Sequence, residues 1–544
     1  QLAAHMDFSD EHRDIVQRFW DAPNLISGPG LKAVDLFDAI KAGEVKFLWV
    51  MSTNPLVSMP DAADVRAALS QCDLVVVSDC MANTDTMDVA HLALPAASWG
   101  EKNGTVTNSE RRVSRQRSFL TPYGESKPDW WALTQVAQRL GFAEAFPYQH
   151  PSEVFDEYTR LTGFENEGSR DLDLSGLSGM SREEYDVMAP VQWPINSAYP
   201  NGRQRFFDDG RFYTPSQKAN FLAIEPSLPA KRDGQLVMNT GRVRDHWHTM
   251  TRTAKSARLA QHIREPYVDI HPDDAKTFGI IDGTLASVYN DQGEIRVRAK
   301  ITDAQRKGEI FVPMHWTNRY ASQALMGTLI DKSRDPFSGQ PESKYSGVNI
   351  KPYTPAWQGL LLSRRDLGQP PCDYWAYGPT ATCHGYELAG GSVPSGDSEI
   401  DHMLAWAKAA APEASWMDVK DEFNQHARLV GSIDGRIELI LFMHRDYQFE
   451  TRQWLIESFE QESLKLPERM ALLAGSPAEG VVDDGAIICS CFTVGEKTIA
   501  SAIAEGCTSV EALGEKIKCG TNCGSCIPEL KALIQQAQPQ DKSA

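Results

Sequence analysis

Four cysteines near the end of the chain constrain its chemistry more than any other feature of the sequence. Cys489-x-Cys491 is followed, after 31 residues, by Cys523-x-x-Cys526, and six of the ten cysteines lie beyond residue 488. Two close pairs of thiolates can hold a tetrahedral zinc ion or an iron–sulfur cluster, and a small disulfide module is the third alternative. The spacing therefore predicts a small, cysteine-dependent domain over residues 481–535.

The sequence between the two pairs favours iron over zinc. VGEKTIASAIAEG and VEALGEKI have helical spacing, whereas a zinc ribbon usually places β-hairpins between its ligand pairs. A third helix, IPELKALIQQ, is predicted to begin directly after Cys526, so that its N-terminal amides would stabilise negative charge on a cluster. The pattern strongly resembles the [2Fe–2S] domain related to bacterioferritin-associated ferredoxin. That resemblance implies four cluster ligands, Cys489, Cys491, Cys523 and Cys526.

The other cysteines fall outside this pattern. Cys507 and Cys519 are interpreted as non-ligands, although Cys519 is close to the site in sequence. The remaining four, Cys72, Cys80, Cys372 and Cys383, are scattered, which is typical of free thiols in a reducing cytosol. A disulfide between Cys372 and Cys383 stays open as an alternative.

The rest of the chain is predicted to be multidomain α/β. Helical segments such as LKAVDLFDAIKAG and ADVRAALSQ alternate with the apolar runs VKFLWVMSTNP and CDLVVVSD, which indicates a parallel sheet within a lobe over residues 1–230. Functional loops of such sheets lie at the carboxyl ends of the strands. We therefore expect Asn54, Ser78 and Asp79 at the ligand-binding edge.

The second half reads differently along its length. Residues 232–353 contain strand runs joined by turns, including the hairpin signal NDQG, and predict a compact β-barrel domain. KPYTPAW at 351–357 is interpreted as a linker, and 354–480 as a linker or accessory α+β region. Within that region a hairpin is predicted around Asp434-Gly435, and LIESFEQESLKLPERMALLAG is predicted to be helical.

Charge and hydropathy exclude two classes of partner. The formal net charge of −19 argues against nucleic-acid binding, because a phosphate backbone would be repelled. No run of 18 apolar residues occurs, so no membrane association is predicted. Since the first residue is Gln1 and no apolar signal core follows it, we expect the start to be the interior of a longer chain.

Several motifs resemble, in order and spacing, those of the molybdopterin-guanine-dinucleotide oxidoreductases. They include NPLVSMPD, LVVVSD, LALPAASWGEKNGTVTNSERRVSR, TGRVRDHWHTMTRT and DPFSGQPESKYSGVNIKPY, and they cover roughly residues 1–353. The resemblance implies molybdenum bound by two molybdopterin guanine dinucleotides. One dinucleotide would contact Asn54, Ser78, Asp79, Lys102 and Asp129. Pterin and phosphate contacts would come from Thr240, Gly241, Arg242, His246, Trp247, His248, Thr249 and Lys344.

Each of these motifs has a simpler interpretation when taken alone. Asn54-Pro55 could be a plain turn and Ser78-Asp79 a helix N-cap. The pair His246 and His248, at i and i+2 of a strand, could bind zinc, although no third ligand lies nearby in sequence. Four basic residues could form a solvated face or a nucleic-acid patch, namely Arg111, Arg112, Arg115 and Arg117.

A cysteine domain after a molybdenum-binding body is similar to the bacterial assimilatory nitrate reductase branch of the family. This implies a cytoplasmic enzyme that reduces nitrate to nitrite, with ferredoxin, flavodoxin or an NADH-dependent reductase subunit as electron donor. The family's N-terminal [4Fe–4S] motif and molybdenum-ligating cysteine have no counterpart here, so we expect a C-terminal part and assign no catalytic residue. A formate dehydrogenase-like oxidoreductase and a non-enzymatic Fe–S electron-transfer or assembly protein are the alternatives.

Overall fold

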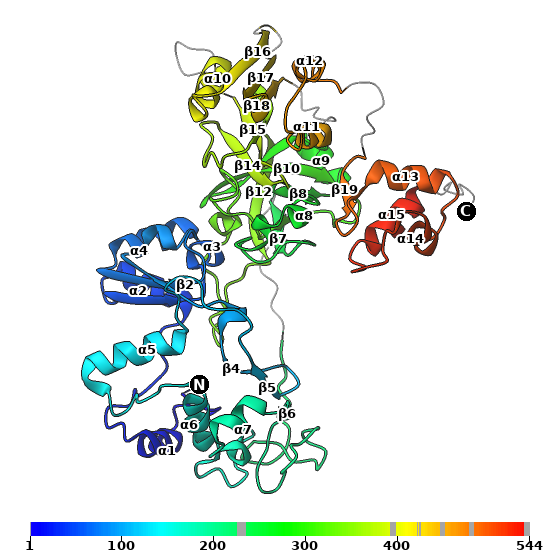
Figure 1. Ribbon diagram of the computed structural model, residues 1–544. Coiled ribbons are helices and arrows are strands. Elements are labelled where there is room, and N and C mark those ends of the chain that lie inside the picture. The colour runs from blue at the N-terminus through cyan, green and yellow to red at the C-terminus, as the bar shows by residue number, and fades with distance from the viewer. Residues whose placement is uncertain are drawn as a thin grey trace. The chain divides into compact units, whose positions relative to one another are not determined.

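The computed structural model describes residues 2–225, 235–391, 399–421, 423, 426–445, 452–477 and 484–537. The chain forms two compact units (Figure 1). The first comprises Gln1–Thr53 and Ala68–Ala230, and the second comprises Asn54–Ala67 and Lys231–Ala544. None of the helices among the described residues is long and apolar enough to cross a membrane.

The first unit contains the predicted parallel sheet. Strands β1 (Phe47–Met51), β2 (Leu74–Asp79) and β3 (Leu92–Pro95) pair in parallel in that order, and helix α2 (Ala33–Lys41) precedes β1. Val75, Val76 and Val77 of β2 are buried, as the apolar run predicted. Strand β3 was not predicted, because its short LALP segment carries no clear alternation.

The remainder of this unit has a separate apolar core. Leu161 and Tyr185 pack there with Met6 and Val16 from the start of the chain. Local sequence patterns do not predict this core, because its apolar residues are far apart in sequence. Its elements are α1 (Asp10–Trp20), β4 (Gly104–Thr107), β5 (Arg112–Gln116), α5 (Asp129–Ala137), α6 (Pro151–Gly163), α7 (Arg182–Val187) and β6 (Val191–Gln192).

A closed six-stranded barrel confirms the predicted β-barrel fold. The strand order is β10-β8-β11-β7-β12-β9, with Met238, Val288 and Val312 among the side chains that fill the interior. The predicted hairpin at NDQG joins β9 to β10. The barrel elements are β7 (Leu236–Gly241), α8 (Ala257–Ala260), β8 (Tyr267–Ile270), α9 (Pro272–Phe278), β9 (Leu285–Asn290), β10 (Gly293–Ile301), β11 (Glu309–Pro313) and β12 (Ser346–Pro352).

Residues 54–67 pack with this barrel rather than with the strand that precedes them. The amide of Asp61 donates to the carbonyl of Ile330 at 3.0 Å, and Lys332 forms an ion pair with Asp64. Gly327 permits the close approach, because a Cβ there would lie 2.8 Å from the carbonyl oxygen of Met59. Helix α3 (Pro55–Ser58) lies in this segment, and α4 (Ala62–Gln71) begins in it.

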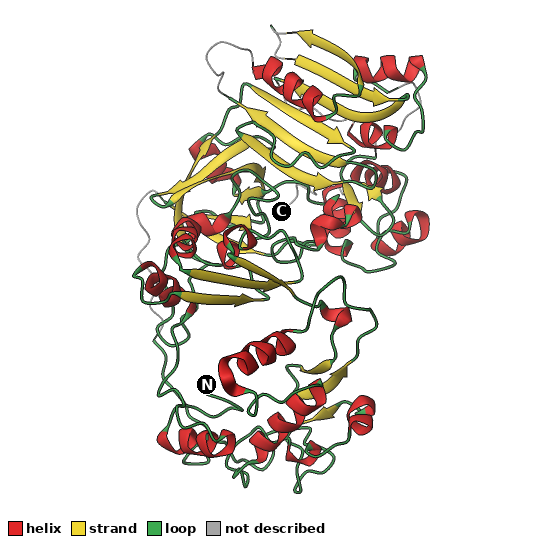
Figure 2. Cartoon of the chain, turned by 60° about the vertical axis from the view of Figure 1, so that its left-hand side comes forward, coloured by secondary structure: helices red, strands yellow, loops and turns green. Residues whose placement is uncertain are grey.

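An antiparallel sheet of six strands follows the barrel, and the predicted linker at 351–357 is partly right, because it reduces to the connection between the end of β12 at Pro352 and the start of β13 at Trp357. Trp357, at the start of β13, is fully buried, and the yellow arrows of Figure 2 show how extended this sheet is. Helix α10 covers one face, whereas α11 and α12 cover the other. The strand order β14-β15-β13-β18-β17-β16 uses β13 (Trp357–Ser363), β14 (Tyr374–Pro379), β15 (His384–Gly390), β16 (Ser415–Asp421), β17 (His426–Ile433) and β18 (Arg436–His444).

Two local predictions within this sheet had different outcomes. The hairpin is confirmed, since Asp434 and Gly435 join β17 to β18 with φ values of 51° and 83°. The helical prediction for residues 455–475 was only partly right, because the segment divides at Phe459–Lys465 into two helices. The helices on the sheet are α10 (Glu399–Ala410), α11 (Arg452–Ser458) and α12 (Leu466–Ala474).

The last described region is a small helical body around the cysteines. The three predicted helices are confirmed as α13 (Glu496–Ala504), α14 (Val510–Ile517) and α15 (Ile527–Ala537). A short pair of strands, β19 (Ile487–Cys489) and β20 (Val494–Gly495), precedes them. Leu513 and Leu530 are fully buried in the core of this body, next to Cys519.

The barrel core provides a stability test with a matched control. Ile295 is 1% exposed inside the barrel, whereas Ile281 is 67% exposed. We expect Ile295→Ala to lower the free energy of unfolding by about 2–5 kcal/mol, because it leaves a cavity. The same substitution at Ile281 should cost less than about 1 kcal/mol. Denaturant unfolding of both variants measures the difference, and equal midpoints would contradict the assigned core.

Candidate cofactor and cluster sites

The fold brings the four predicted cluster cysteines together as two pairs. The Sγ atoms of Cys491 and Cys523 lie 3.2 Å apart. The Cys489 thiol is near enough to the thiols of Cys526 and Cys519 to help raise the pKa of both. All ten cysteines of the chain are free, so the alternatives of a disulfide module and of a Cys372–Cys383 bridge are not realised.

The two pairs differ in their environment. Cys489 and Cys526 are each 2% exposed, whereas Cys523 is exposed to solvent. Burial raises the pKa of Cys526 to about 11, against the positive charge of Arg244, which acts to lower it. Hydrogen bonds from Ser525 lower the pKa of Cys523. A cluster held here would have one inner and one outer pair of thiolates, with the outer pair facing solvent.

This arrangement offers the ligand set of a two-iron cluster. A [2Fe–2S] cluster takes two thiolates at each iron, and two thiol pairs are present. Cys519 is fully buried beside Cys489, as its position in the sequence suggested, and Cys507 is 8% exposed in the core. The four predicted ligands therefore fit the cluster.

Two of the predicted dinucleotide residues, Ser78 and Asp79, lie at the end of strand β2 in the first unit. The Ser78 hydroxyl accepts a hydrogen bond from the Trp49 indole at 2.8 Å, and Asp79 Oδ1 accepts from the Met81 amide at 2.9 Å. No helix begins there, so the alternative of a helix N-cap is wrong. Asn54 is the N-cap residue of α3 and is 9% exposed, which excludes a plain turn at Asn54-Pro55.

Lys102 and Asp129, distant in sequence, are brought together. Lys102 Nζ lies 2.7 Å from Asp129 Oδ2, and both side chains are about a quarter exposed. Asp129 Oδ1 is buried and has no hydrogen-bond partner among the described residues. An unsatisfied carboxylate oxygen is costly to bury, and it suits a ligand that donates N–H groups, as guanine does.

The barrel residues form a second cluster at the end of β7. The Lys344 ammonium donates to the Thr240 carbonyl, and the Thr240 hydroxyl donates to the Ser343 carbonyl at 2.7 Å. Gly241 packs against Phe311, whose ring would lie 2.9 Å from an added Cβ. Lys344 and Thr240 therefore occupy one site, although 104 positions separate them.

The segment that follows is a strained loop, so the prediction of a strand carrying His246 and His248 was wrong. Asp245, His248 and Met250 have φ values of 70°, 40° and 61°, which side chains with a Cβ rarely adopt. His246 is 6% exposed, and its Nε2 lies 2.9 Å from the Ile263 carbonyl oxygen. Burial lowers the pKa of His246 and favours a neutral ring.

Besides His248, Trp247 is an exposed member of this loop. Its side chain is 51% exposed, and the Arg242 guanidinium lies 5.3 Å from the centre of its ring. Thr249 is half-buried beside it. A planar cation above an aromatic ring offers stacking and hydrogen-bond donors together, which suits a pterin with a phosphate.

His315 was missed as a site residue, although it was visible in the FVPMHW segment after β11. It is fully buried, and its two ring nitrogens join the ends of the loop. Nε2 accepts from the Val243 amide at 2.9 Å, so Nδ1 carries the proton and donates to the His248 carbonyl at 2.7 Å. His315 therefore holds residues 243–248 in their strained conformation.

The four arginines contact groups of their own unit, and because Arg117 is exposed and Arg112 is 39% exposed, the alternative of a solvated face is partly right. Arg115 is 9% exposed and donates to the Tyr185 carbonyl at 2.9 Å, while Arg117 donates to the Asp186 carbonyl at 2.7 Å. Arg111 donates to the Gln204 carbonyl at 3.0 Å. Arg112 pairs with Glu110 at 2.8 Å. These cations bind carbonyls and a neighbouring carboxylate within their own unit.

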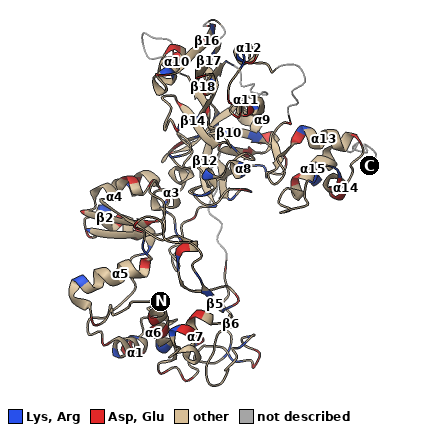
Figure 3. Ribbon diagram, viewed as in Figure 1, with Lys and Arg blue, Asp and Glu red and all other residues tan. Residues whose placement is uncertain are grey.

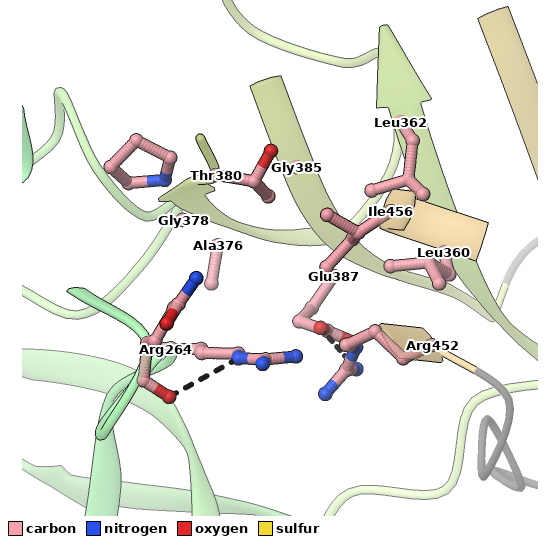
Figure 4. A pocket seen from close by; sticks show the side chains of 12 residues that line it. Arg264, Leu360, Leu362, Ala376, Gly378, Thr380, Gly385, Glu387, Arg452 and Ile456 are labelled. Carbon is pink, nitrogen blue, oxygen red and sulfur yellow. Dashed lines mark hydrogen bonds and ion pairs between the residues drawn. The ribbon is translucent and has the colours of Figure 1, made fainter. Parts of the chain in front are cut away.

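A small cavity beside the antiparallel sheet is too small for a substrate. Figure 4 shows Arg264, Arg452 and Glu387 converging there, with Arg452 paired to Glu387. The volume is about 20 Å³, which holds one water molecule at most. We assign this cavity to packing.

His315 generates a prediction for the pH dependence of stability. Burial lowers its pKa from 6.5 to about 4, so the folded chain keeps it neutral where the unfolded chain is protonated. Stability from this residue is complete above pH 6.5 and is lost as the pH falls toward 4. His315→Gln keeps a donor and an acceptor but cannot titrate. We expect a shallower fall of the thermal midpoint across that window, and an unchanged slope would contradict the assignment.

Three regions of the chain match known protein families. Residues 10–139 match molybdopterin oxidoreductase, residues 236–347 the molydopterin dinucleotide binding domain, and residues 487–536 the BFD-like [2Fe-2S] binding domain. The second range coincides with the closed barrel, and the third contains all four predicted cluster ligands.

Similar proteins extend the comparison over nearly the whole chain. A nitrate reductase of Klebsiella oxytoca is 42% identical over 538 residues, covering 98% of this chain and 60% of that protein. A nitrate reductase of Shewanella frigidimarina is 30% identical, covering 99% and 60%. The F420-dependent formate dehydrogenase subunit alpha of Methanocaldococcus jannaschii is 32% identical, covering 62% and 47%.

The chain thus spans about 60% of the length of the two nitrate reductases. Separate parts of it match the molybdopterin oxidoreductase, molydopterin dinucleotide binding domain and BFD-like [2Fe-2S] binding domain families, and it is similar to nitrate reductases over almost its entire length.

Proposed function

We propose that this chain is part of a molybdenum-dependent nitrate reductase, which converts nitrate, two protons and two electrons into nitrite and water. The observation that carries the proposal is the similarity to the Klebsiella oxytoca nitrate reductase. That alignment covers 98% of the chain, so it includes the cysteine domain. The paired thiols of this domain support a second part of the proposal, that electrons enter through a [2Fe–2S] cluster.

The residues of the chain would bind and orient the cofactor. Within the first unit, Lys102 and the unsatisfied carboxylate oxygen of Asp129 are suited to phosphate and guanine, together with Ser78 and Asp79. The resemblance implies a further contact from Asn54. The exposed Trp247 and Arg242 are suited to the pterin. Thr240, Gly241 and Lys344 shape the loop beside them, and the buried His246 supports it from behind. When bound, the molybdenum cofactor supplies the two-electron chemistry itself.

Finer features of the proposal follow from the resemblance alone. They are an assimilatory role, a cytoplasmic location, a C-terminal position within a longer enzyme, and a [4Fe–4S] cluster and molybdenum-ligating cysteine outside this chain. Ferredoxin, flavodoxin or an NADH-dependent reductase subunit would supply the electrons. The domain limits 1–230, 232–353, 354–480 and 481–535 stay predictions in the same way.

A formate dehydrogenase-like oxidoreductase is the second candidate. The similarity to the Methanocaldococcus jannaschii subunit supports it, but that alignment covers only 62% of the chain. The alignment with the nitrate reductase includes the remaining third, which favours the first candidate. A non-enzymatic Fe–S protein remains as a third alternative, and the absence of bound molybdenum and guanine nucleotide would distinguish it.

The full-length protein tests the proposal directly. We expect molybdenum and guanine nucleotide in a ratio of one to two, nitrite formation with a viologen reductant and nitrate, and no reduction of a viologen dye by formate. Formate-dependent dye reduction without nitrite formation would establish the second candidate. Metal-free, nucleotide-free protein from molybdenum-replete cells would contradict both enzyme proposals.

The cluster ligands give a second test. Cys→Ser at Cys489, Cys491, Cys523 or Cys526 should abolish the visible thiolate-to-iron absorption, because those transitions require the ligating sulfurs. Cys507→Ser is the matched control, since that thiol is buried in the same core and outside the pattern. The four ligand variants should lose turnover with the physiological donor and retain it with a viologen. Colourless wild-type protein with stoichiometric zinc would contradict the cluster.

A further inference from the structure

A set of charged side chains joins the helical cysteine body to the strained barrel loop. The Arg244 guanidinium donates to the Ile488 carbonyl at 2.8 Å and lies 3.2 Å from Glu529 Oε2. On the other side of Glu529, Oε1 lies 2.9 Å from His262 Nε2. Glu529 stands in the first turn of α15, the helix that begins after Cys526. The last ligand and the barrel loop are therefore connected through one carboxylate.

Asp245 makes a second connection, to the Cys489-x-Cys491 segment. Its Oδ2 accepts a hydrogen bond from the Ser490 hydroxyl at 3.0 Å, and Ser490 stands between Cys489 and Cys491. The same oxygen lies 3.4 Å from Arg244 Nε and 3.6 Å from His262 Nδ1. Asp245, which precedes the buried His246, thus contacts the segment that carries two of the predicted cluster ligands.

The contact is more enclosed than an incidental surface ion pair. The side chains of Arg244, Asp245 and His262 are only 16%, 12% and 9% exposed, and that of Glu529 is 37% exposed. Ion pairs that are buried to this extent are screened less by water and salt than exposed ion pairs are. Asp245 also has a φ of 70°, a conformation that its surroundings must hold in place.

We propose that Arg244, Asp245 and His262 form a docking latch that holds the cluster domain against the strained barrel loop. Arg244 and His262 act through Glu529, and Asp245 acts through Ser490. These are positioning residues, and none is a cluster ligand. The role in electron delivery rests on the proposed function. Nitrate reduction consumes two electrons and a [2Fe–2S] cluster passes one at a time, so the latch keeps the cluster beside the loop for both transfers.

Hydrogen–deuterium exchange of the full-length protein tests the latch without any assay of activity. Glu529→Gln removes the charge shared by Arg244 and His262 and keeps the shape. We expect amides of residues 243–247 in the barrel and 488–491 in the cluster domain to exchange about fivefold faster, as loss of one partly enclosed pair predicts. Glu529→Lys, which sets two cations against each other, should have a larger effect.

A matched control is available on the neighbouring helix. Charged residues occur on α13, α14 and α15 (Figure 3), and Glu515 on α14 is exposed. Glu515→Gln should leave both segments unchanged. If Glu529→Gln speeds exchange only within α15 and leaves residues 243–247 unchanged, Glu529 has a local role in its own helix and the latch is overturned.

Kinetics separate the latch from the proposed function. Glu529→Gln should slow nitrite formation driven by the physiological donor about fivefold and leave viologen-driven turnover unchanged, with unchanged cluster absorption. Equal loss with both reductants would overturn the positioning role. If the wild type reduces no nitrate with any reductant, the proposed function fails, while the exchange experiment still decides whether the latch exists.

Discussion

The pairing of β7 with β11 on one side and β12 on the other determines where the barrel site lies. β7 is parallel to β11 and antiparallel to β12, so the end of β7, the end of β11 and the start of β12 meet at the same rim. Thr240 and Gly241 close β7, His315 follows β11, and Lys344 precedes β12. Backbone hydrogen bonds within a closed barrel fix the register of its strands. The fixed register therefore brings these side chains together at the rim.

The strained loop after β7 depends on that rim. Three residues with left-handed φ values are costly in isolation, and they are held by His315, by the buried His246 and by the Arg244–Asp245 contacts. The loop exposes Trp247 and His248, while His246 is buried. A rigid loop that presents a tryptophan and an arginine is well suited to a planar, anionic ligand, because little conformational freedom remains to be lost on binding.

The cysteine domain combines a local chemical motif with a contact made at long range. Its cysteines approach one another within some forty residues of chain, and short helices separate them. Its connection to the barrel instead uses Arg244 and His262, which lie more than two hundred residues upstream. The same four cysteines could serve a cluster domain that moves freely or one that is docked on the barrel. Under the docking proposal, these charged side chains decide between the two.

Several elements could be predicted from short-range sequence patterns, because periodicity or turn residues encode each of them. They are the parallel strands β1 and β2, the barrel strands, the Asp434-Gly435 hairpin and the three cysteine-domain helices. The four cysteines were likewise visible as a spacing, and the candidate cofactor residues as motifs of a resembling family. The core around Leu161 and Tyr185, the buried role of Arg115, the inward turn of His246 and the contact of Lys102 with Asp129 were decided only by the tertiary structure. The physical reason is that a local sequence pattern determines which conformation and which side-chain chemistry a segment offers. Burial and partners depend on segments far away in sequence, which meet only when the chain has folded.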